Sequence, residues 1–168
     1  MVLRWFRRRG GVFARPVRPA PQPTGRTSVQ AARRAYPGDF AGIPQISYSP
    51  HPDGLPDPGE VVWAWVPFEE DHSRGKDRPA LIIGRDGAFL LGLMLTSKDH
   101  DRDAEQEARH HRSWLDVGIG GWDAQRRPSE VRLDRILRLS PGEVRREGAA
   151  LSRAMFDQVA AGVRSARR

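Results

Sequence analysis

The 168-residue chain contains no cysteine, and this absence removes several classes of protein at once. Without thiols there is no disulfide framework, no thiolate zinc site and no cysteine nucleophile, so packing alone must hold the fold together. No stretch approaches the roughly 18 consecutive apolar residues that a membrane helix needs. The early apolar run at residues 2–6 is too short and too charged for a signal-peptide core. We therefore expect a cytoplasmic protein without a membrane span.

Acidic residues and lysine are both absent from the first 38 positions. These positions hold nine arginines, whereas the remainder holds 19 basic residues against 21 acidic ones, so the net charge of +7 originates in the N-terminal segment. Its Pro-, Gly- and Arg-rich composition predicts a disordered tail and linker over residues 1–57, ahead of a folded domain over residues 58–168. Such a tail could touch RNA nonspecifically, or anchor at an anionic membrane through Trp5, Phe6 and Phe13. We favour the first alternative, a solvated arm that touches RNA nonspecifically.

The apolar runs of the domain predict an antiparallel sheet. Residues 61–68 are β-branched and aromatic, and a buried strand follows a polar loop and runs over residues 78–84. Asp86-Gly87 is typical of a two-residue hairpin turn into a strand over residues 88–95. A highly charged excursion over residues 98–112, with a helical turn at 104–109, is predicted before apolar residues resume at Trp114. An alternating pattern predicts a further strand over residues 129–139.

Two signals near the C-terminus predict helices. Ser140 to Glu143 has the spacing of a capping box, which predicts a short helix that ends at Gly148. A last helix is predicted to begin after Ser152 as its N-cap. Apolar side chains recur through it at four-residue spacing and are assigned to the core: Leu151, Met155, Val159 and Val163. The sum is a mainly β, α+β fold, with a small antiparallel sheet or barrel and a C-terminal helix.

Five polar residues stand at or near the ends of apolar strands, where loops can hold reactive groups on a rigid scaffold: His72, Arg78, Thr96, Arg132 and Asp134. This combination suits phosphodiester chemistry, because arginine braces a phosphate bidentately and stabilises the charge that develops on it. Each residue also has an ordinary interpretation. Asp134 could form a surface ion pair, Arg78 could begin a strand, and Thr96 is a common strand residue.

Two further groups of residues each have two interpretations. His100, Asp101 and Asp103, followed by His110 and His111, have the composition of a metal site, but interleaved arginines favour a solvated loop, and we predict no metal. The tryptophans Trp63, Trp65, Trp114 and Trp122 are expected in the core or in a dimer contact. Trp122 follows Gly120-Gly121 in a loop, so it is the candidate for stacking on an RNA base.

Four segments, taken in order, resemble the MazF/PemK family of type II toxin-antitoxin toxins: PGEVVW at 58–63, GKDRPALII at 75–83, LTS at 95–97 and RLDRI at 132–136. The resemblance covers residues 59–163. It implies a small SH3-like barrel that dimerises and an endoribonuclease that cuts single-stranded RNA at short sequences. It also implies a cognate antitoxin that blocks the site, with contact to operator DNA only through that antitoxin.

The resemblance also implies roles for individual residues. Arg78 looks like the family's phosphate-binding catalytic arginine, and Thr96, with Ser97 beside it, looks like its catalytic hydroxyl residue at the end of the third strand. Arg132 and Asp134 are similar to the Arg-x-Asp pair of the PemK branch. The predicted substrate-binding residues are His72, Ser97 and Trp122.

The implied mechanism needs neither metal nor cofactor. Asp134 takes the proton of the ribose 2′-OH, which attacks the neighbouring phosphorus, while Arg78 and Arg132 stabilise the charge on the phosphate. The expected product carries a 2′,3′-cyclic phosphate. The alternative is a catalytically silent SH3-like module that binds nucleic acid or a partner protein through the same face.

Overall fold

The computed structural model describes residues 36–97 and 112–167. The predictions for residues 1–35 and 98–111 lie outside the described residues. These are most of the tail, the helical turn at 104–109, and the metal-ligand candidates His100, Asp101, Asp103, His110 and His111.

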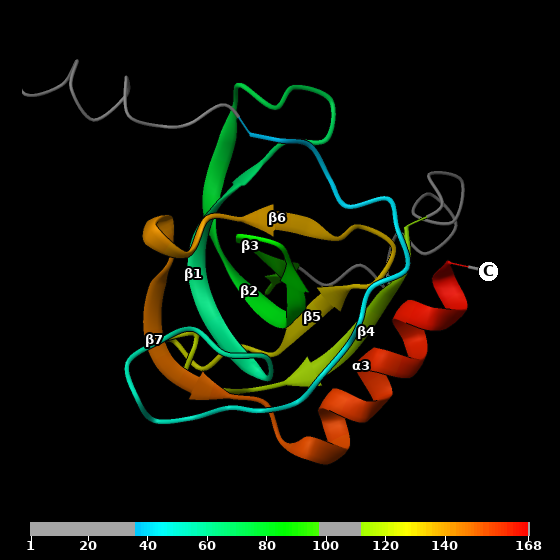
Figure 1. The fold of residues 1–168 in the computed structure, drawn as a ribbon. Helices are drawn as coiled ribbons and strands as arrows, with labels where there is room; N and C mark the ends of the chain where they lie inside the picture. The colour runs from blue at the N-terminus through cyan, green and yellow to red at the C-terminus, as the bar shows by residue number, and fades with distance from the viewer. Residues whose placement is uncertain (1–35, 98–111, 168) are drawn as a thin grey trace, which may run out of the picture. The chain divides into compact units, whose positions relative to one another are not determined.

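Seven strands of the described residues form one curled, antiparallel sheet in the shape of a half-barrel (Figure 1). The strands are β1 (Glu60–Pro67), β2 (Gly75–Asp86), β3 (Phe89–Thr96), β4 (Trp114–Gly118), β5 (Ser129–Arg132), β6 (Leu137–Leu139) and β7 (Arg145–Ala150). Their order is β4-β5-β3-β2-β1-β7, and β6 pairs with β3 beside β5. The helix α3 (Arg153–Ala166) packs beside β4. The mainly β fold with a C-terminal helix is thus confirmed.

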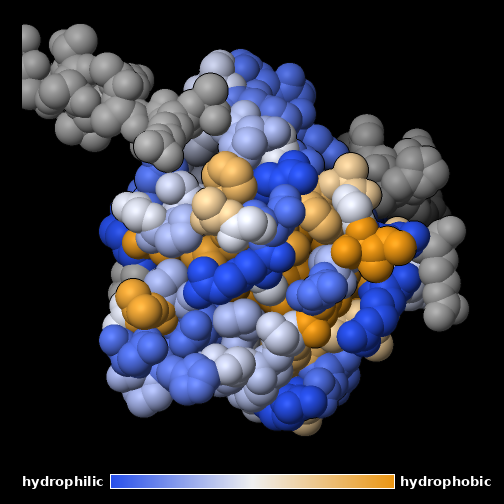
Figure 2. All heavy atoms as spheres, viewed as in Figure 1, coloured by the Kyte–Doolittle hydropathy of each residue, from blue (hydrophilic) through white to orange (hydrophobic). Residues whose placement is uncertain are grey.

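Both faces of the central strands are buried, which explains their nearly continuous apolar runs. Because successive side chains point to opposite faces, Val61 joins one core cluster and Val62 joins the other. The Val61 cluster includes the apolar face of α3, with Phe156 and Val159. The Val62 cluster contains Ala80 and Ile82 of β2. On the outer surface, Figure 2 shows hydrophobic patches interrupted by strongly hydrophilic side chains.

Two strand predictions needed correction. The polar residues before Arg78 belong to β2, which begins at Gly75 because Gly75–Asp77 pairs with the end of β1. The single strand predicted over residues 129–139 is two strands, because β5 and β6 pair with different ends of β3. Between β5 and β6 the chain turns toward Ser113, whose carbonyl accepts a hydrogen bond from the amide of Leu133 at 2.8 Å.

The helix predicted to end at Gly148 was wrong. Only a single 3₁₀ turn forms at Pro141–Glu143, and the Ser140 side chain makes no capping bond. Residues 145–150 instead form β7, because the edge of β1 offers backbone partners that outweigh a weak local helix signal. The last helix is confirmed, since Ser152 accepts a hydrogen bond from the amide of Met155 at 3.3 Å.

Residues 36–57 contain no helix or strand, yet they pack on the half-barrel. The amide of Phe40 donates to Ile136 O at 2.8 Å, and that of Ser47 donates to Ile83 O at 3.0 Å. Residues ahead of Pro58 therefore contribute contacts to the half-barrel. Scattered apolar residues gave no periodic signal, because this segment is held by isolated contacts. In the described part of the chain, no helix is long and apolar enough to cross a membrane.

Candidate functional site

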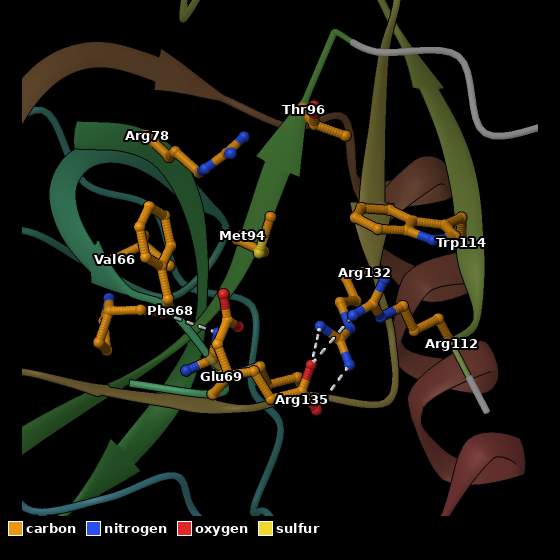
Figure 3. Close-up of a pocket in the computed structure, with 12 residues that line it drawn as sticks. Val66, Phe68, Glu69, Arg78, Met94, Thr96, Arg112, Trp114, Arg132 and Arg135 are labelled. Carbon is orange, nitrogen blue, oxygen red and sulfur yellow. Dashed lines mark hydrogen bonds and ion pairs between the residues drawn. The ribbon is translucent and has the colours of Figure 1, made fainter. Parts of the chain in front are cut away.

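The ends of several strands surround a hollow of about 380 Å³, which we call the Arg78 hollow (Figure 3). It is lined by Val66, Pro67, Phe68, Glu69, Glu70, Arg78, Met94, Thr96, Arg112, Trp114, Arg132 and Arg135. Three of the predicted catalytic residues, Arg78, Thr96 and Arg132, therefore share one cavity although they come from three different strands. Curvature of the sheet brings these strand ends together.

Arg78 enters the hollow from the polar start of β2. Alternation along the strand places it on the same face as Ala80 and Ile82, at the end where their cluster opens to solvent. Its guanidinium has no hydrogen bond or ion pair with any described residue. Its charge and its donors are therefore available to an anion in the hollow.

Arg132, in contrast to Arg78, is buried and paired. It is 5% exposed, and two carboxylates bind its guanidinium. Nη1 and Nη2 donate to Glu69 at 3.0 and 3.2 Å, and Nη2 donates to Asp134 Oδ2 at 2.7 Å. Burial alone would lower the pKa of Arg132, but the hydrogen bonds and charges of Asp134 and Glu69 outweigh it and raise that pKa. Arg132 is a fixed permanent cation, suited to electrostatic stabilisation and unsuited to donating a proton.

Glu69 was missed by the sequence analysis, which assigned it to an unremarkable polar loop. The hydrogen bond and charge of Arg132 hold the pKa of the Glu69 carboxyl below its usual value, against the effect of partial burial. The carboxylate is therefore ionised at neutral pH. The available signal was two acidic residues, Glu69-Glu70, directly after an apolar strand.

Asp134, the predicted general base, forms an ion pair with Arg132 and does not line the hollow. Arg132 Nε donates to both of its oxygens, at 3.2 and 3.1 Å. The amide of Ser113 donates to Asp134 Oδ1 at 2.8 Å. These bonds fix the carboxylate against the chain at the start of β4, where it orients the guanidinium of Arg132.

The three predicted substrate-binding residues lie elsewhere. His72 is exposed, and its ring meets that of Tyr36 edge-on at 5.1 Å between centroids. Ser97 is exposed just beyond Thr96, which is itself 8% exposed. Trp122 is 5% exposed and belongs to the core, where its Nε1 donates to Ser129 Oγ at 3.1 Å. The stacking role suggested for Trp122 is therefore corrected, because its ring lies in the core, close against Gly120.

A second missed residue is Arg135, which lines the hollow and is almost fully buried. Its Nε donates to Asp39 Oδ2 at 2.8 Å, and its Nη1 donates to the carbonyl of Pro67 at 2.9 Å. It thus connects the end of β1 with the segment that precedes the sheet. Among residues 36–97 and 112–167, no group of three or more side chains is arranged to hold a metal ion.

Residues 57–166 match the family model described as the PemK-like, MazF-like toxin of type II toxin-antitoxin systems. No curated protein matches the chain. The matched segment contains every residue that lines the Arg78 hollow. It also spans more than half of the sequence, and the family predicted from the four motifs is therefore confirmed. The chain belongs to the PemK-like, MazF-like toxin family of type II toxin-antitoxin systems.

Proposed function

We propose that the Arg78 hollow binds and cleaves single-stranded RNA, and that the chain is a metal-independent endoribonuclease whose activity inhibits growth. One observation carries this proposal. Arg78, Thr96 and Arg132 line a single hollow, and the guanidinium of Arg78 is unpaired among the described residues. An unpaired cation beside a hydroxyl and a second fixed cation provides the donors that a phosphodiester requires.

The proposed reaction balances without a co-reactant. A carboxylate takes the proton of the ribose 2′-OH, the 2′-oxygen forms a bond to phosphorus, and the bond from phosphorus to the 5′-oxygen breaks. The 5′-oxygen takes up a proton from solvent water and leaves as a hydroxyl, the carboxyl group returns its proton to solvent, and the other product ends in a 2′,3′-cyclic phosphate. Arg78 and Arg132 stabilise the charge on the phosphorane. DNA lacks the 2′-OH and is not cleaved.

Asp134 is the base that we propose, following the Arg-x-Asp pattern. Both of its oxygens already accept hydrogen bonds from Arg132, so it must give up one of them to reach the 2′-OH. Glu69 is the alternative carboxylate, because it lines the hollow directly. In either case Arg132 remains charged and stays between the two carboxylates.

The second candidate function is a silent module that binds RNA without cutting it. The observation that favours it is the pairing of Arg132 with both Glu69 and Asp134, since a phosphate at Arg132 must compete with two carboxylates already in place. Such a module would still bind RNA through Arg78.

One experiment separates the two functions. Purified full-length chain is incubated in EDTA with a long single-stranded RNA, the cut sites and product ends are mapped, and the RNA is remade with a single 2′-deoxy nucleotide at one mapped site. The enzyme leaves a 2′,3′-cyclic phosphate and fails at the substituted site while cutting the others. The silent module shifts the RNA on a gel and leaves every bond intact.

Family membership implies an antitoxin partner. We propose that this antitoxin blocks the hollow, that the toxin acts in the cytoplasm as a homodimer, and that contact with operator DNA occurs only through the antitoxin. Co-expression with the cognate antitoxin tests the first point, because an antitoxin that blocks the hollow must restore growth and suppress RNA cleavage together.

A further inference from the structure

Residues 36–48, which we call the strap, precede the segment matched to the toxin family and cross the sheet beside β6 (Figure 1). Two glycines of the half-barrel accommodate it. A Cβ on Gly84 would lie 2.3 Å from the carbonyl oxygen of Gln45, and one on Gly59 would lie 2.8 Å from the ring of Tyr48. The half-barrel therefore leaves room for the strap backbone at Gln45 and for the ring of Tyr48.

The strap reaches the wall of the Arg78 hollow through Asp39. The guanidinium of Arg135 donates to both Asp39 oxygens, at 2.8 and 3.2 Å, and also to the carbonyl of Pro67. Pro67 is the last residue of β1, so Asp39 and Arg135 anchor the point where the loop of residues 68–74 leaves the sheet. Burial raises the pKa of Asp39, but hydrogen bonds from Arg135 and Tyr36 outweigh it and lower that pKa, so the carboxylate stays charged.

A second contact holds the same loop near its tip. The ring of Tyr36 meets that of His72 at 5.1 Å, and its hydroxyl donates to Asp39 Oδ1 at 2.5 Å. Tyr36 also packs on the core cluster around Val62. The strap thus holds the loop at its start, through Asp39 and Arg135, and near its tip, through Tyr36, whose hydroxyl is bonded to Asp39.

This loop carries Glu69, whose carboxylate accepts hydrogen bonds from Nη1 and Nη2 of Arg132. The loop is closed by a hydrogen bond within itself, from the amide of Phe68 to Arg74 O at 2.8 Å. The position of Glu69 over the hollow therefore depends on the contacts at Pro67 and His72.

We propose that Asp39 and Tyr36 are positioning residues for the Arg78 hollow, and that the strap adds to the family domain a brace that holds Glu69 and Arg132 in place for RNA cleavage. This inference rests on the proposed function. Asp39 and Tyr36 act through Arg135, His72 and the loop, and neither touches RNA.

The test uses the full chain with Asp39→Asn, the conservative variant Asp39→Glu, and Asp157→Asn as a matched control. Asp157 forms an exposed ion pair with Arg153 on α3, away from the hollow. Under RNA saturation, Asp39→Asn lowers kcat by about tenfold with KM little changed, which lies within the range that contacts remote from a site contribute. Asp39→Glu restores most of the rate, and Asp157→Asn leaves it unchanged.

A second arm does not depend on activity. Amide exchange followed by NMR reports the hydrogen bond of Phe68 in the loop and that of Phe156 at the start of α3. Asp39→Asn speeds exchange at Phe68 and leaves Phe156 unchanged. Tyr36→Leu, which keeps an apolar side chain but removes the ring and hydroxyl, gives the same pattern if Asp39→Asn does not fold.

The cleavage and exchange measurements distinguish failure of the proposed nuclease from failure of the proposed brace. A wild type that binds RNA without cutting it overturns the proposed nuclease, and the exchange arm then decides on the brace alone. Faster exchange at Phe40 with no change at Phe68 overturns the brace, because the strap is then a local cover. Full cleavage by both Asp39→Asn and Tyr36→Leu also overturns it.

Discussion

Two arginines in the same hollow differ in what surrounds their guanidinium groups. Arg132 is buried between Glu69 and Asp134, whereas Arg78 is half-buried and has no partner among the described residues. A buried cation must be paired, because an isolated charge in the interior is too costly. Arg132 therefore contributes fixed geometry, and Arg78 contributes a charge that a phosphate can neutralise.

The ion pair of Glu69 makes stability depend on pH. The pKa of Glu69 is lowered from its usual value of 4.5, chiefly by the hydrogen bond from Arg132. Its ionised form therefore stabilises the fold fully above about pH 4.5. That contribution is lost as pH falls through the lower pKa of the folded state. We expect thermal unfolding to show Glu69→Gln less stable than wild type at pH 7, by a small margin because Glu69 is half-exposed.

The stability margin between wild type and Glu69→Gln must shrink as the pH falls below about 4.5 and through the lowered pKa of Glu69 in the folded protein. A constant difference in melting temperature over the whole range would show that the carboxylate charge contributes nothing.

The sequence analysis selected some of the residues that line the Arg78 hollow and missed others, for a physical reason. Arg78, Thr96 and Arg132 stand in short local motifs at strand ends, so pattern alone could place them. Glu69 and Arg135 acquire their roles from partners far away in the chain, and no local spacing records such pairing. Trp122 was misplaced because two glycines before it indicated an exposed loop, whereas the loop folds its ring inward.

At the scale of elements, local patterns predicted what local forces determine. The central strands and the last helix follow from apolar runs and from the Ser152 cap. β7 and the break between β5 and β6 could not be predicted, because they depend on which strand edge is available to pair. Tertiary pairing outweighed the capping-box signal at Ser140.

The cap of α3 gives a direct test of a local force. Ser152→Ala removes the acceptor for the Met155 amide and should lower the free energy of unfolding by about 1 kcal/mol. Ser165→Ala, at the other end of the same helix and exposed, serves as the control. Equal urea midpoints for the two variants would contradict the capping role.

The fit of the strap against β2 gives a second test. Gly84→Ala places a methyl group against the carbonyl of Gln45 and should destabilise the protein by about 1–3 kcal/mol, as overpacking does. Gly142→Ala, where a Cβ meets nothing within 4 Å, is the matched control and should be close to neutral. Urea denaturation measures both, and a neutral Gly84→Ala would mean that the strap does not seat there.

At the scale of the whole molecule, the half-barrel places strand ends that are distant in sequence around one hollow. The strap, which lies outside the segment matched to the family, contacts the wall of that hollow. The fold class and the family were predictable, because four motifs in order specify a sheet that the apolar runs independently support. The strap was not, because isolated hydrogen bonds through residues 36–48 leave no periodic pattern.

The most direct test of the account is the rate at which Arg78→Ala cleaves single-stranded RNA in a single turnover. Arg164→Ala, which removes an equal charge from the exposed face of α3, is measured beside it. We predict that Arg78→Ala loses at least about 100-fold in rate, the usual cost of removing a donor that stabilises a transition state, while it stays folded. Arg164→Ala should cut normally. Cleavage by folded Arg78→Ala within a few-fold of wild type would contradict the assignment of the hollow as the catalytic site.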